Sequence, residues 1–248
     1  MSTLYETLHL PHLGASATLL ADEARRQQWT YEEFLHQALT KEIEGRDQVA
    51  FLRRKRQARI PVHKTLEEFD ITFQPSLSAA QVREWSTLTF VRTCCNLVFV
   101  GPPGTGKTHL SVALAELALA AGHSVVYTTL AEFLAAMESA SYPQLVRQRL
   151  RRYTSPELLV LDEMGYVSLT PAQAQHVFAL VTGRYEQGAM ILTSNLTFGQ
   201  WGGLLGDDVL ATALLDRLLH HADVVAINGA SYRMKERLPT VRAPSSEG

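Results

Sequence analysis

The chain has 248 residues, of which 46% are hydrophobic and 19% are charged, and its formal net charge is −2. This length and composition predict one large globular domain, or one medium domain with a smaller appendage. No apolar run approaches the roughly 18 residues that a membrane-spanning helix needs, and the first residues lack the pattern of a signal peptide. Cys94 and Cys95 are the only cysteines, so we expect no framework of disulfides and a cytoplasmic protein.

Residues 1–60 are predicted to form a small, entirely helical module. No segment of this region has a convincing strand pattern. One helix is expected over 16–28, and a second begins after Thr30, because Thr30 and Glu33 fit a capping box in which each side chain bonds a free backbone amide. Apolar residues at helical spacing continue from Phe34 towards a basic run at the end of the module.

Residues 61–95 are predicted to connect this module to the rest of the chain. The segment begins at Pro61 and mixes Pro, Ser and Thr with isolated aromatic residues. Ser78 is expected to cap a helix that continues over 79–90. The connector thus leads into the main domain.

From residue 96 to residue 238, apolar segments alternate with helical segments. Continuous apolar segments are typical of strands that are covered on both faces. The alternation predicts an α/β domain with a parallel five-stranded sheet flanked by helices, and residues 239–248 form a polar tail. The predicted strands are 96–100, 124–129, 157–162, 189–195 and 223–227.

Two short segments concentrate positive charge. Residues 53–59 contain five basic side chains in seven positions, and residues 147–152 contain four in six. Such runs are either solvated helix faces or phosphate-binding surfaces, and two in one chain favour a surface that binds duplex DNA through its backbone. The candidate DNA-binding residues are Arg53, Arg54, Lys55, Arg56, Arg147, Arg149, Arg151 and Arg152.

The strongest motif is the segment GPPGTGKT, which lies between a predicted strand and a predicted helix and matches the phosphate-loop pattern G-x-x-x-x-G-K-[ST]. Its glycines let successive backbone amides face an anion at the start of a helix. Lys107 can reach the β- and γ-phosphates of a nucleotide, and the hydroxyl of Thr108 can ligate Mg²⁺. The predicted nucleotide-binding residues are Gly101, Pro102, Pro103, Gly104, Thr105, Gly106, Lys107 and Thr108.

A second motif, LLVLDE at 158–163, is an apolar strand that ends in two carboxylates. Asp162 would hold Mg²⁺ beside the phosphate loop, and Glu163 would orient or deprotonate an attacking water, which predicts hydrolysis. An ordinary acidic turn is the alternative. The strand at 124–129, between the two motifs, is typical of P-loop ATPases with an additional strand and argues against small-molecule kinases.

Asn195 follows the predicted strand ILTS and could hold the attacking water near the γ-phosphate. Taken alone, this signal is weak, because Ser-Asn after a strand is most often a turn or a helix cap. His220 and His221 have no carboxylate or cysteine at ligand spacing in the sequence, so we expect packing or surface histidines instead of metal ligands.

The motifs occur in an order that is similar to that of a known family. The segments GPPGTGKTHL, LLVLDEMGY, TSN followed by FGQW, LLDRLLHHA and SYRMKE resemble the IstB family over roughly residues 60–237. IstB proteins are ATP-binding helpers of insertion-sequence transposition, related to DnaC-type helicase loaders and to bacterial initiator ATPases of the AAA+ superfamily. The resemblance implies an AAA+ P-loop ATPase that uses ATP and Mg²⁺, forms a homo-oligomer on duplex DNA with ATP sites at subunit interfaces, and recruits and stimulates a transposase.

The resemblance also implies residue roles. Asp162 and Glu163 correspond to the Walker B pair and Asn195 to sensor 1. Phe69 is assigned to the adenine pocket, although the aromatic residues of the connector form no sharp motif. The implied catalytic residues are Lys107, Asp162, Glu163, Asn195, Arg217 and Arg233.

Two of these residues are arginines for which elementary chemistry offers a use. A phosphoryl transition state spreads negative charge over the γ-oxygens, and placed cations stabilise it. Arg217 corresponds to an arginine finger aimed at the nucleotide of a neighbouring subunit, and Arg233 to a sensor 2 arginine within the same subunit. The alternative for Arg217 is an internal ion pair with Asp216, but adjacent residues on a helix do not face each other.

Three functions follow from these patterns. The first is an ATP-dependent transposition regulator, and the second is a helicase loader with nearly the same ATPase core. The third is a solitary nucleotide-binding protein whose basic runs are merely solvated. The resemblance to the IstB family, including the segment LLHHA and the lack of a cysteine-rich zinc module near the N-terminus, favours the first function over the second.

Overall fold

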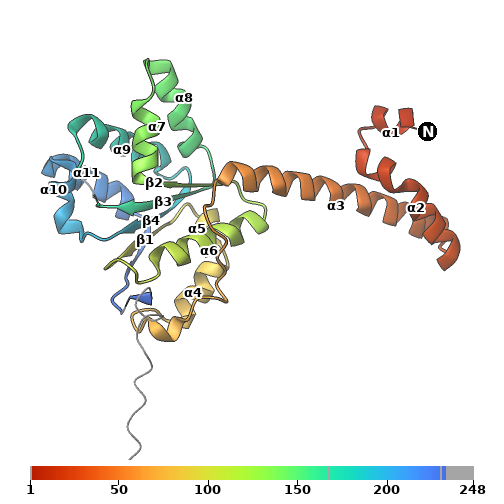
Figure 1. The fold of residues 1–248 in the computed structure, drawn as a ribbon, viewed down its shortest axis with the longest axis horizontal. Helices are drawn as coiled ribbons and strands as arrows, with labels where there is room; N and C mark the ends of the chain where they lie inside the picture. Colours follow the sequence, from red (N-terminus) through yellow and green to blue (C-terminus); the bar gives the residue numbers. More distant parts are fainter. Residues whose placement is uncertain (1, 167, 230, 233–248) are drawn as a thin grey trace, which may run out of the picture. The chain divides into compact units, whose positions relative to one another are not determined.

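The computed structural model describes residues 2–166, 168–229, 231 and 232, and Figure 1 labels their helices and strands. The chain divides into two compact units, Met1–Arg56 and Gln57–Gly248. The described part of the first unit is helical, and the second unit contains the sheet.

The N-terminal unit begins with α1, a helix that the sequence patterns did not indicate. The capping box ahead of α3 is confirmed, because the Thr30 amide donates to Glu33 Oε2 at 2.7 Å and the Glu33 amide donates to Thr30 Oγ1 at 3.2 Å. The buried carboxylate of Glu42 accepts hydrogen bonds from the amides of His12 and Leu13, which fixes the first turn of α2 against α3. The helices are α1 (Ser2–Thr7), α2 (Pro11–Gln27) and α3 (Tyr31–Ala58).

The second unit is built on a parallel sheet of five strands in the order β2-β3-β4-β1-β5, which confirms the predicted fold class. β1, β3 and β4 are buried on both faces, because their sequences are continuously apolar. β4 separates β1 from β3, whereas β2, which lies between the two motifs in the sequence, is an edge strand. The strands are β1 (Asn96–Val100), β2 (Val125–Thr129), β3 (Leu158–Met164), β4 (Ala189–Ser194) and β5 (Ala222–Ala226).

Helices cover both faces of this sheet (Figure 1). On one face α6 packs against β3 and β4, with α4 and α5 beside it. On the other face α7 to α11 form a large hydrophobic cluster with β3 and β4. No described helix has both the length and the apolar character needed to cross a membrane. The helices are α4 (Ala79–Ser86), α5 (Thr89–Arg92), α6 (Lys107–Ala120), α7 (Leu130–Glu138), α8 (Pro143–Thr154), α9 (Pro171–Arg184), α10 (Trp201–Leu205) and α11 (Asp208–Leu219), with short 3₁₀ helices at Ile71–Phe73 and Phe198–Gln200.

The helix predicted over 79–90 is divided into α4 and α5. The capping box at Ser78 is confirmed, but the first helix ends at Ser86. Buried Leu88 has a left-handed backbone with φ of 57°. The hydroxyls of Ser86 and Thr87 donate to carbonyl oxygens of the preceding turn, and such side-chain bonds compete with helix continuation.

Candidate nucleotide-binding and hydrolysis site

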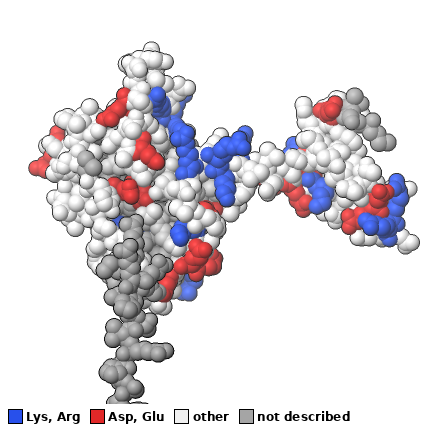
Figure 2. Space-filling model, viewed as in Figure 1, with Lys and Arg blue, Asp and Glu red and all other residues white. Residues whose placement is uncertain are grey.

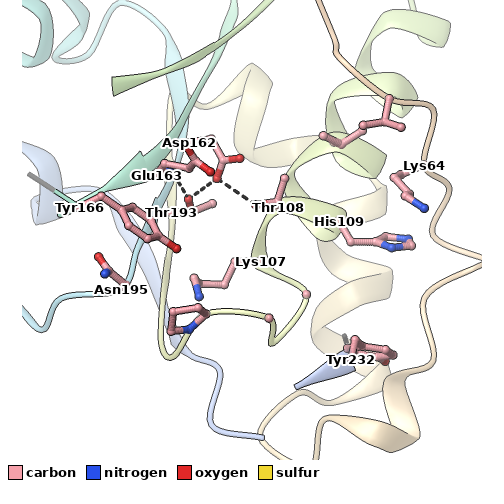
Figure 3. Close-up of a pocket in the computed structure, with 15 residues that line it drawn as sticks. Lys64, Lys107, Thr108, His109, Asp162, Glu163, Tyr166, Thr193, Asn195 and Tyr232 are labelled. Atoms are coloured by element: carbon pink, nitrogen blue, oxygen red, sulfur yellow. Dashed lines mark hydrogen bonds between the residues drawn. The ribbon is translucent and has the colours of Figure 1, made fainter. Parts of the chain in front are cut away.

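A pocket of about 340 Å³ opens at the carboxyl ends of the central strands, beside the start of α6. Ligands of open parallel sheets bind at this edge. Figure 3 shows side chains from α6, β3, β4 and the connector pointing into the same space. Predicted residues that line it are Pro103, Gly104, Gly106, Lys107, Thr108, Asp162, Glu163 and Asn195. The pocket is completed by Val62, Lys64, His109, Val112, Tyr166, Thr193 and Tyr232.

The phosphate loop runs directly from β1 into α6. Gly104 and Gly106 have left-handed backbones with φ of 83° and 94°. A Cβ at Gly106 would lie 2.6 Å from the ring of Phe69, so both backbone angle and packing require glycine there. α6 begins at Lys107, and its first amides have no partner within the helix. The loop can therefore bind an anion such as a nucleotide phosphate.

Lys107 is held within this loop and is only 8% exposed. Its Nζ donates to the carbonyl oxygens of Gly101 at 2.7 Å and Pro102 at 2.6 Å. The hydroxyl of Thr105, which is also buried, donates to the Pro102 carbonyl at 3.0 Å. These bonds orient the ammonium group toward the pocket. There the ammonium group can supply positive charge to a bound phosphate.

Asp162 is 1% exposed and is held by three hydroxyl groups, two of which, those of Thr108 and Thr193, are drawn in Figure 3. Tyr127 donates to Oδ2 at 2.6 Å, Thr108 donates to Oδ1 at 3.2 Å, and Thr193 also donates to Oδ1. Burial and the nearby Asp162 carboxylate raise the pKa of Tyr127, so its hydroxyl stays a donor. The Thr108 and Asp162 oxygens face one another, and such oxygens fit Mg²⁺.

Glu163 departs from regular strand geometry. Its φ is +64°, and the pairing of β3 with β4 shifts between Leu161 and Met164. The Glu163 amide donates to Thr193 Oγ1 at 3.0 Å. This bulge directs the exposed carboxylate into the pocket beside Asp162. The predicted end of the strand at 162 is therefore wrong, because β3 continues through the bulge.

Asn195 follows β4 and lines the pocket with Glu163 and Lys107. Its Oδ1 is buried and forms no hydrogen bond with any described residue, and a buried polar atom of this kind usually has a ligand or water as partner. Gly165 packs directly against it. Gly165 has φ of 110°, and a Cβ there would lie 2.6 Å from Asn195 Oδ1 and 2.7 Å from Leu196. Glycine is thus required beside the amide.

Aromatic side chains border the pocket on the connector side. The Phe69 ring packs against His109 and Tyr232, with centroid distances of 5.4 and 5.6 Å. His109 Nε2 lies 2.9 Å from the Thr65 carbonyl oxygen, which attaches the connector to α6. His109 and Tyr232 line the pocket, whereas Phe69 is 5% exposed and packs behind them. The predicted role of Phe69 toward adenine stays a prediction.

Comparison with known proteins agrees with this site. The family model described as IstB-like ATP binding protein matches residues 3–240. The chain belongs to this family. It is 42% identical to an ATP-binding protein of insertion sequence IS21 from Pseudomonas aeruginosa, over 96% of this chain and 89% of that relative. It is 38% identical to an ATP-binding protein of insertion sequence IS5376 from Geobacillus stearothermophilus, over 93% and 92% of the two chains.

Solved structures share the fold of this IstB-like chain. AMPPCP-bound DnaA from Aquifex aeolicus is 25% identical with a TM-score of 0.58, over 73% of this chain and 56% of that chain. The DnaI structure has a TM-score of 0.57 at 20% identity, over 70% and 93% of the two chains, which shows the fold alone. The matched region is thus an AAA+ ATPase fold, and its family binds ATP.

Arg217 of this IstB-like chain lies far from its own nucleotide pocket. It lies in the last turn of α11. Asn96, the first residue of β1, donates from Nδ2 to the Leu218 carbonyl oxygen at 2.8 Å, so the end of α11 is attached to the start of β1. The pocket lies at the other end of the five-residue strand, roughly 15 Å away at ~3.3 Å per residue. The guanidinium carbon lies 5.1 Å from the centroid of the Phe178 ring, and no ion pair with Asp216 is formed.

Arg233 lies outside the described residues, so its assignment stays a prediction. The residue before it, Tyr232, is bound to the phosphate loop. Its amide donates to the Gly104 carbonyl at 2.8 Å, and its hydroxyl donates to the Asp70 carbonyl. The last described residue is thus part of the wall of the pocket.

The predicted DNA-binding arginines of the ATPase unit lie on α8, and Figure 2 shows basic side chains along it. Arg149 is half-buried and donates to two oxygens at the end of α7, so it also joins the two helices. In the N-terminal unit, Arg54 is half-buried near the end of α3. The exposed members of the two runs are Arg53, Lys55, Arg56, Arg147, Arg151 and Arg152.

His220 and His221 are exposed, and a carboxylate that is distant from them in the sequence lies close to both. Glu186 Oε1 lies 3.6 Å from His221 Nε2, and the ligand atoms of all three residues are within 4.8 Å of one another. Glu186 belongs to the turn between α9 and β4, far from the histidines in the sequence, so sequence spacing gave no sign of it.

The sequence patterns also missed two residues that hold Asp162. Tyr127 lies within β2 and Thr193 within β4, and both hydroxyls point to the same carboxylate. The available signal is a hydroxyl-bearing residue near the end of an otherwise apolar strand. This signal is common, and only the sheet order brings the two strands to β3.

Proposed function

We propose that this chain is an ATP-dependent regulator of transposition. ATP binding drives its assembly on duplex DNA, the assembly recruits and stimulates a transposase, and ATP hydrolysis controls the assembly. The insertion-sequence descriptions of relatives at 42% and 38% identity support the biological setting. The location of Arg217, remote from its own pocket, is the observation that carries the assembly step.

Nucleotide binding rests on the phosphate loop. The triphosphate lies against the amides at the start of α6, and Lys107 exchanges its carbonyl partners for phosphate oxygens. Thr108 and Asp162 hold Mg²⁺, which neutralises phosphate charge when bound. His109 and Tyr232 offer ring surfaces to the base.

Hydrolysis uses the two side chains that reach the pocket beside Asp162. Glu163 orients a water and accepts its proton, while Asn195 holds the same water through its unpartnered amide oxygen. The water oxygen bonds to the γ-phosphorus, the bond between that phosphorus and the β–γ bridging oxygen breaks, and ADP leaves with the electron pair. Lys107 stabilises the charge on the γ-oxygens from one side.

The remaining charge is supplied by arginines. Arg217 reaches the nucleotide of a neighbouring subunit, because its own pocket lies at the opposite end of the strands. Arg233 acts within the same subunit, immediately after Tyr232. An ATP site is then complete only when two subunits meet, which makes assembly depend on ATP.

DNA binding is assigned to exposed arginines of α8 and to the basic end of α3. Contacts to phosphates make such binding salt-dependent and tolerant of sequence. The test is to measure binding of the full chain to a labelled DNA duplex, with ATP, ADP or no nucleotide, over a series of salt concentrations. ATP should tighten binding. The triple variant Arg147→Ala/Arg151→Ala/Arg152→Ala should weaken it and make the salt slope shallower by up to about 2.7, at ~0.9 per lost contact.

The matched control removes the same charge elsewhere, as Arg25→Ala/Arg26→Ala/Arg83→Ala, from exposed positions. This control should bind DNA like the unchanged chain. The proposed DNA surface would be contradicted if DNA binding depended on neither ATP nor salt, or if both triple variants lost DNA affinity equally. Retention of the transposase on DNA only when this protein and ATP are present tests recruitment directly.

The helicase-loader alternative rests on fold alone. The DnaC loader structure is 19% identical with a TM-score of 0.51, whereas the relatives of higher identity carry insertion-sequence descriptions. A pull-down that retains a replicative helicase and leaves the transposase unbound would favour the loader.

A further inference from the structure

A cluster of three metal-ligating side chains lies on the ATPase unit outside the nucleotide pocket. His220 and His221 directly follow α11, which ends at Leu219, and Glu186 lies in the turn before β4 with a left-handed φ of 55°. Their ligand atoms lie within 4.8 Å of one another, and all three residues are exposed. No other group of three such residues is this close among the described residues.

A hydrogen bond orients the first histidine. Tyr185 Oη lies 2.9 Å from His220 Nδ1. This contact engages Nδ1 of His220, so Nε2 is the ring nitrogen that can bind a metal ion. Histidine ligands are typically fixed in this way through their second nitrogen.

The second histidine already has near-ligand geometry with the carboxylate. His221 Nε2 and Glu186 Oε1 are 3.6 Å apart, beyond a good hydrogen bond. Two ligands of a tetrahedral zinc ion, each about 2.1 Å from the metal, lie roughly 3.4 Å apart. The two histidine rings are inclined by 58° with centroids 4.2 Å apart, so they are not stacked face to face. Small rotations of exposed side chains bring all three ligands to one ion.

Two other histidine–carboxylate pairs offer two metal-ligating side chains instead of three. His123 Nδ1 lies 2.8 Å from Glu157, and His63 contacts Glu116. Neither pair has a third metal-ligating residue near it among the described residues. These pairs therefore serve as controls for two-ligand surface binding.

We propose that Glu186, His220 and His221 bind a divalent transition-metal ion, with Zn²⁺ preferred, and leave one coordination position open to water. Imidazole and carboxylate ligands suit this class of ion, and two histidines with a glutamate form a familiar open zinc set. Arg217, Glu186 and His221 border one small pocket, so a bound ion adds positive charge beside Arg217. The site shares no residue with the nucleotide pocket, so its test is independent of the proposed ATPase function.

The test uses the full chain, freed of metal with EDTA and without nucleotide. Zn²⁺ is titrated by calorimetry, and Co²⁺ is added to record its visible absorption, which reports tetrahedral coordination. We expect one ion per chain. The variants Glu186→Gln, His220→Ala and His221→Ala should each weaken binding by about 100-fold or more, and Tyr185→Phe by about 10-fold, as for partners that orient ligands.

The control variants are His36→Ala, an exposed histidine of the N-terminal unit, and His123→Ala. Both should bind Zn²⁺ like the unchanged chain, and circular dichroism should show that every variant is folded. The proposal is overturned if the unchanged chain binds no Zn²⁺ near 1:1, or if binding survives the three ligand variants. Equal weakening in His123→Ala would also overturn it.

Discussion

At the scale of single residues, the site depends on hydroxyl groups that hold Asp162 in place. Tyr127 and Thr193 contribute nothing to the sequence motifs, yet each donates a hydrogen bond to this buried carboxylate. A carboxylate with fixed orientation can hold a metal ion without reorganising during the reaction. We therefore treat Tyr127 as a positioning residue.

Tyr127→Phe should slow ATP hydrolysis by about tenfold, because a hydrogen bond to a charged group contributes about 1.5–3 kcal/mol. ATP affinity should change much less, and the Mg²⁺ concentration needed for half-maximal rate should rise. Steady-state hydrolysis over a Mg²⁺ series and binding of a fluorescent ATP analogue measure both effects. Tyr153→Phe, another buried tyrosine, is the control. Equal Mg²⁺ dependence in the unchanged chain and Tyr127→Phe would refute the positioning role.

Gly165→Ala should reduce hydrolysis while ATP binding persists. The new Cβ would lie 2.6 Å from Asn195 Oδ1, so the amide must move from the pocket. Gly122→Ala is a matched control, since Gly122 has a comparable φ of 96° but nothing within 4 Å of its added Cβ. Both variants should lose about 1 kcal/mol of stability from backbone strain, measured by urea unfolding. A Gly165→Ala chain that hydrolyses ATP as fast as Gly122→Ala contradicts the role of Asn195.

At the scale of secondary-structure elements, Arg184 joins the end of α9 to the beginnings of two strands. It is 1% exposed and donates to the carbonyl oxygens of Tyr153, Pro156, Glu157 and Ala189. Burial lowers its pKa to about 10, so it remains charged at neutral pH. The side chain thus sets the relative position of β3 and β4, whose other ends form the site.

Arg184→Met should destabilise the ATPase unit by about 3 kcal/mol or more, because buried carbonyl oxygens lose their donors. For a domain of this size the midpoint of thermal unfolding should fall by about 10 °C. Exposed Arg83→Met is the control and should leave the midpoint almost unchanged. Equal midpoints for the two variants would show that Arg184 does not join these elements.

The strands of the sheet are predictable from sequence because each is a continuous apolar run between turn residues. The phosphate loop is equally predictable, since its glycines and Lys107 have fixed spacing. The bulge at Glu163 is not, because it depends on a hydrogen bond to Thr193 from another strand. The break at Leu88 depends on burial of that side chain in the folded core. Features that tertiary contacts create leave little trace in a local pattern.

At the scale of the whole molecule, the segment LLDRLLHHA illustrates the same limit. Its leucines predict a buried helix face, and Leu214 and Leu218 are buried in the large cluster. The sequence cannot show that α11 ends beside the amino ends of the strands, whereas the phosphate loop lies at their carboxyl ends. That location is incompatible with action of Arg217 on its own nucleotide. It supports an ATP site shared by two subunits.

Mixing two inactive variants tests this shared site most directly. Glu163→Gln keeps Arg217 but lacks the carboxylate proposed to accept the proton of water, and Arg217→Ala keeps that carboxylate but lacks the arginine. Each alone should bind ATP and hydrolyse little of it. In a random mixed assembly, about a quarter of the sites combine an intact carboxylate with a neighbour's arginine, so mixing should restore hydrolysis. A mixture that co-assembles yet stays inactive, or Arg217→Ala that hydrolyses ATP normally at every protein concentration, would contradict the account.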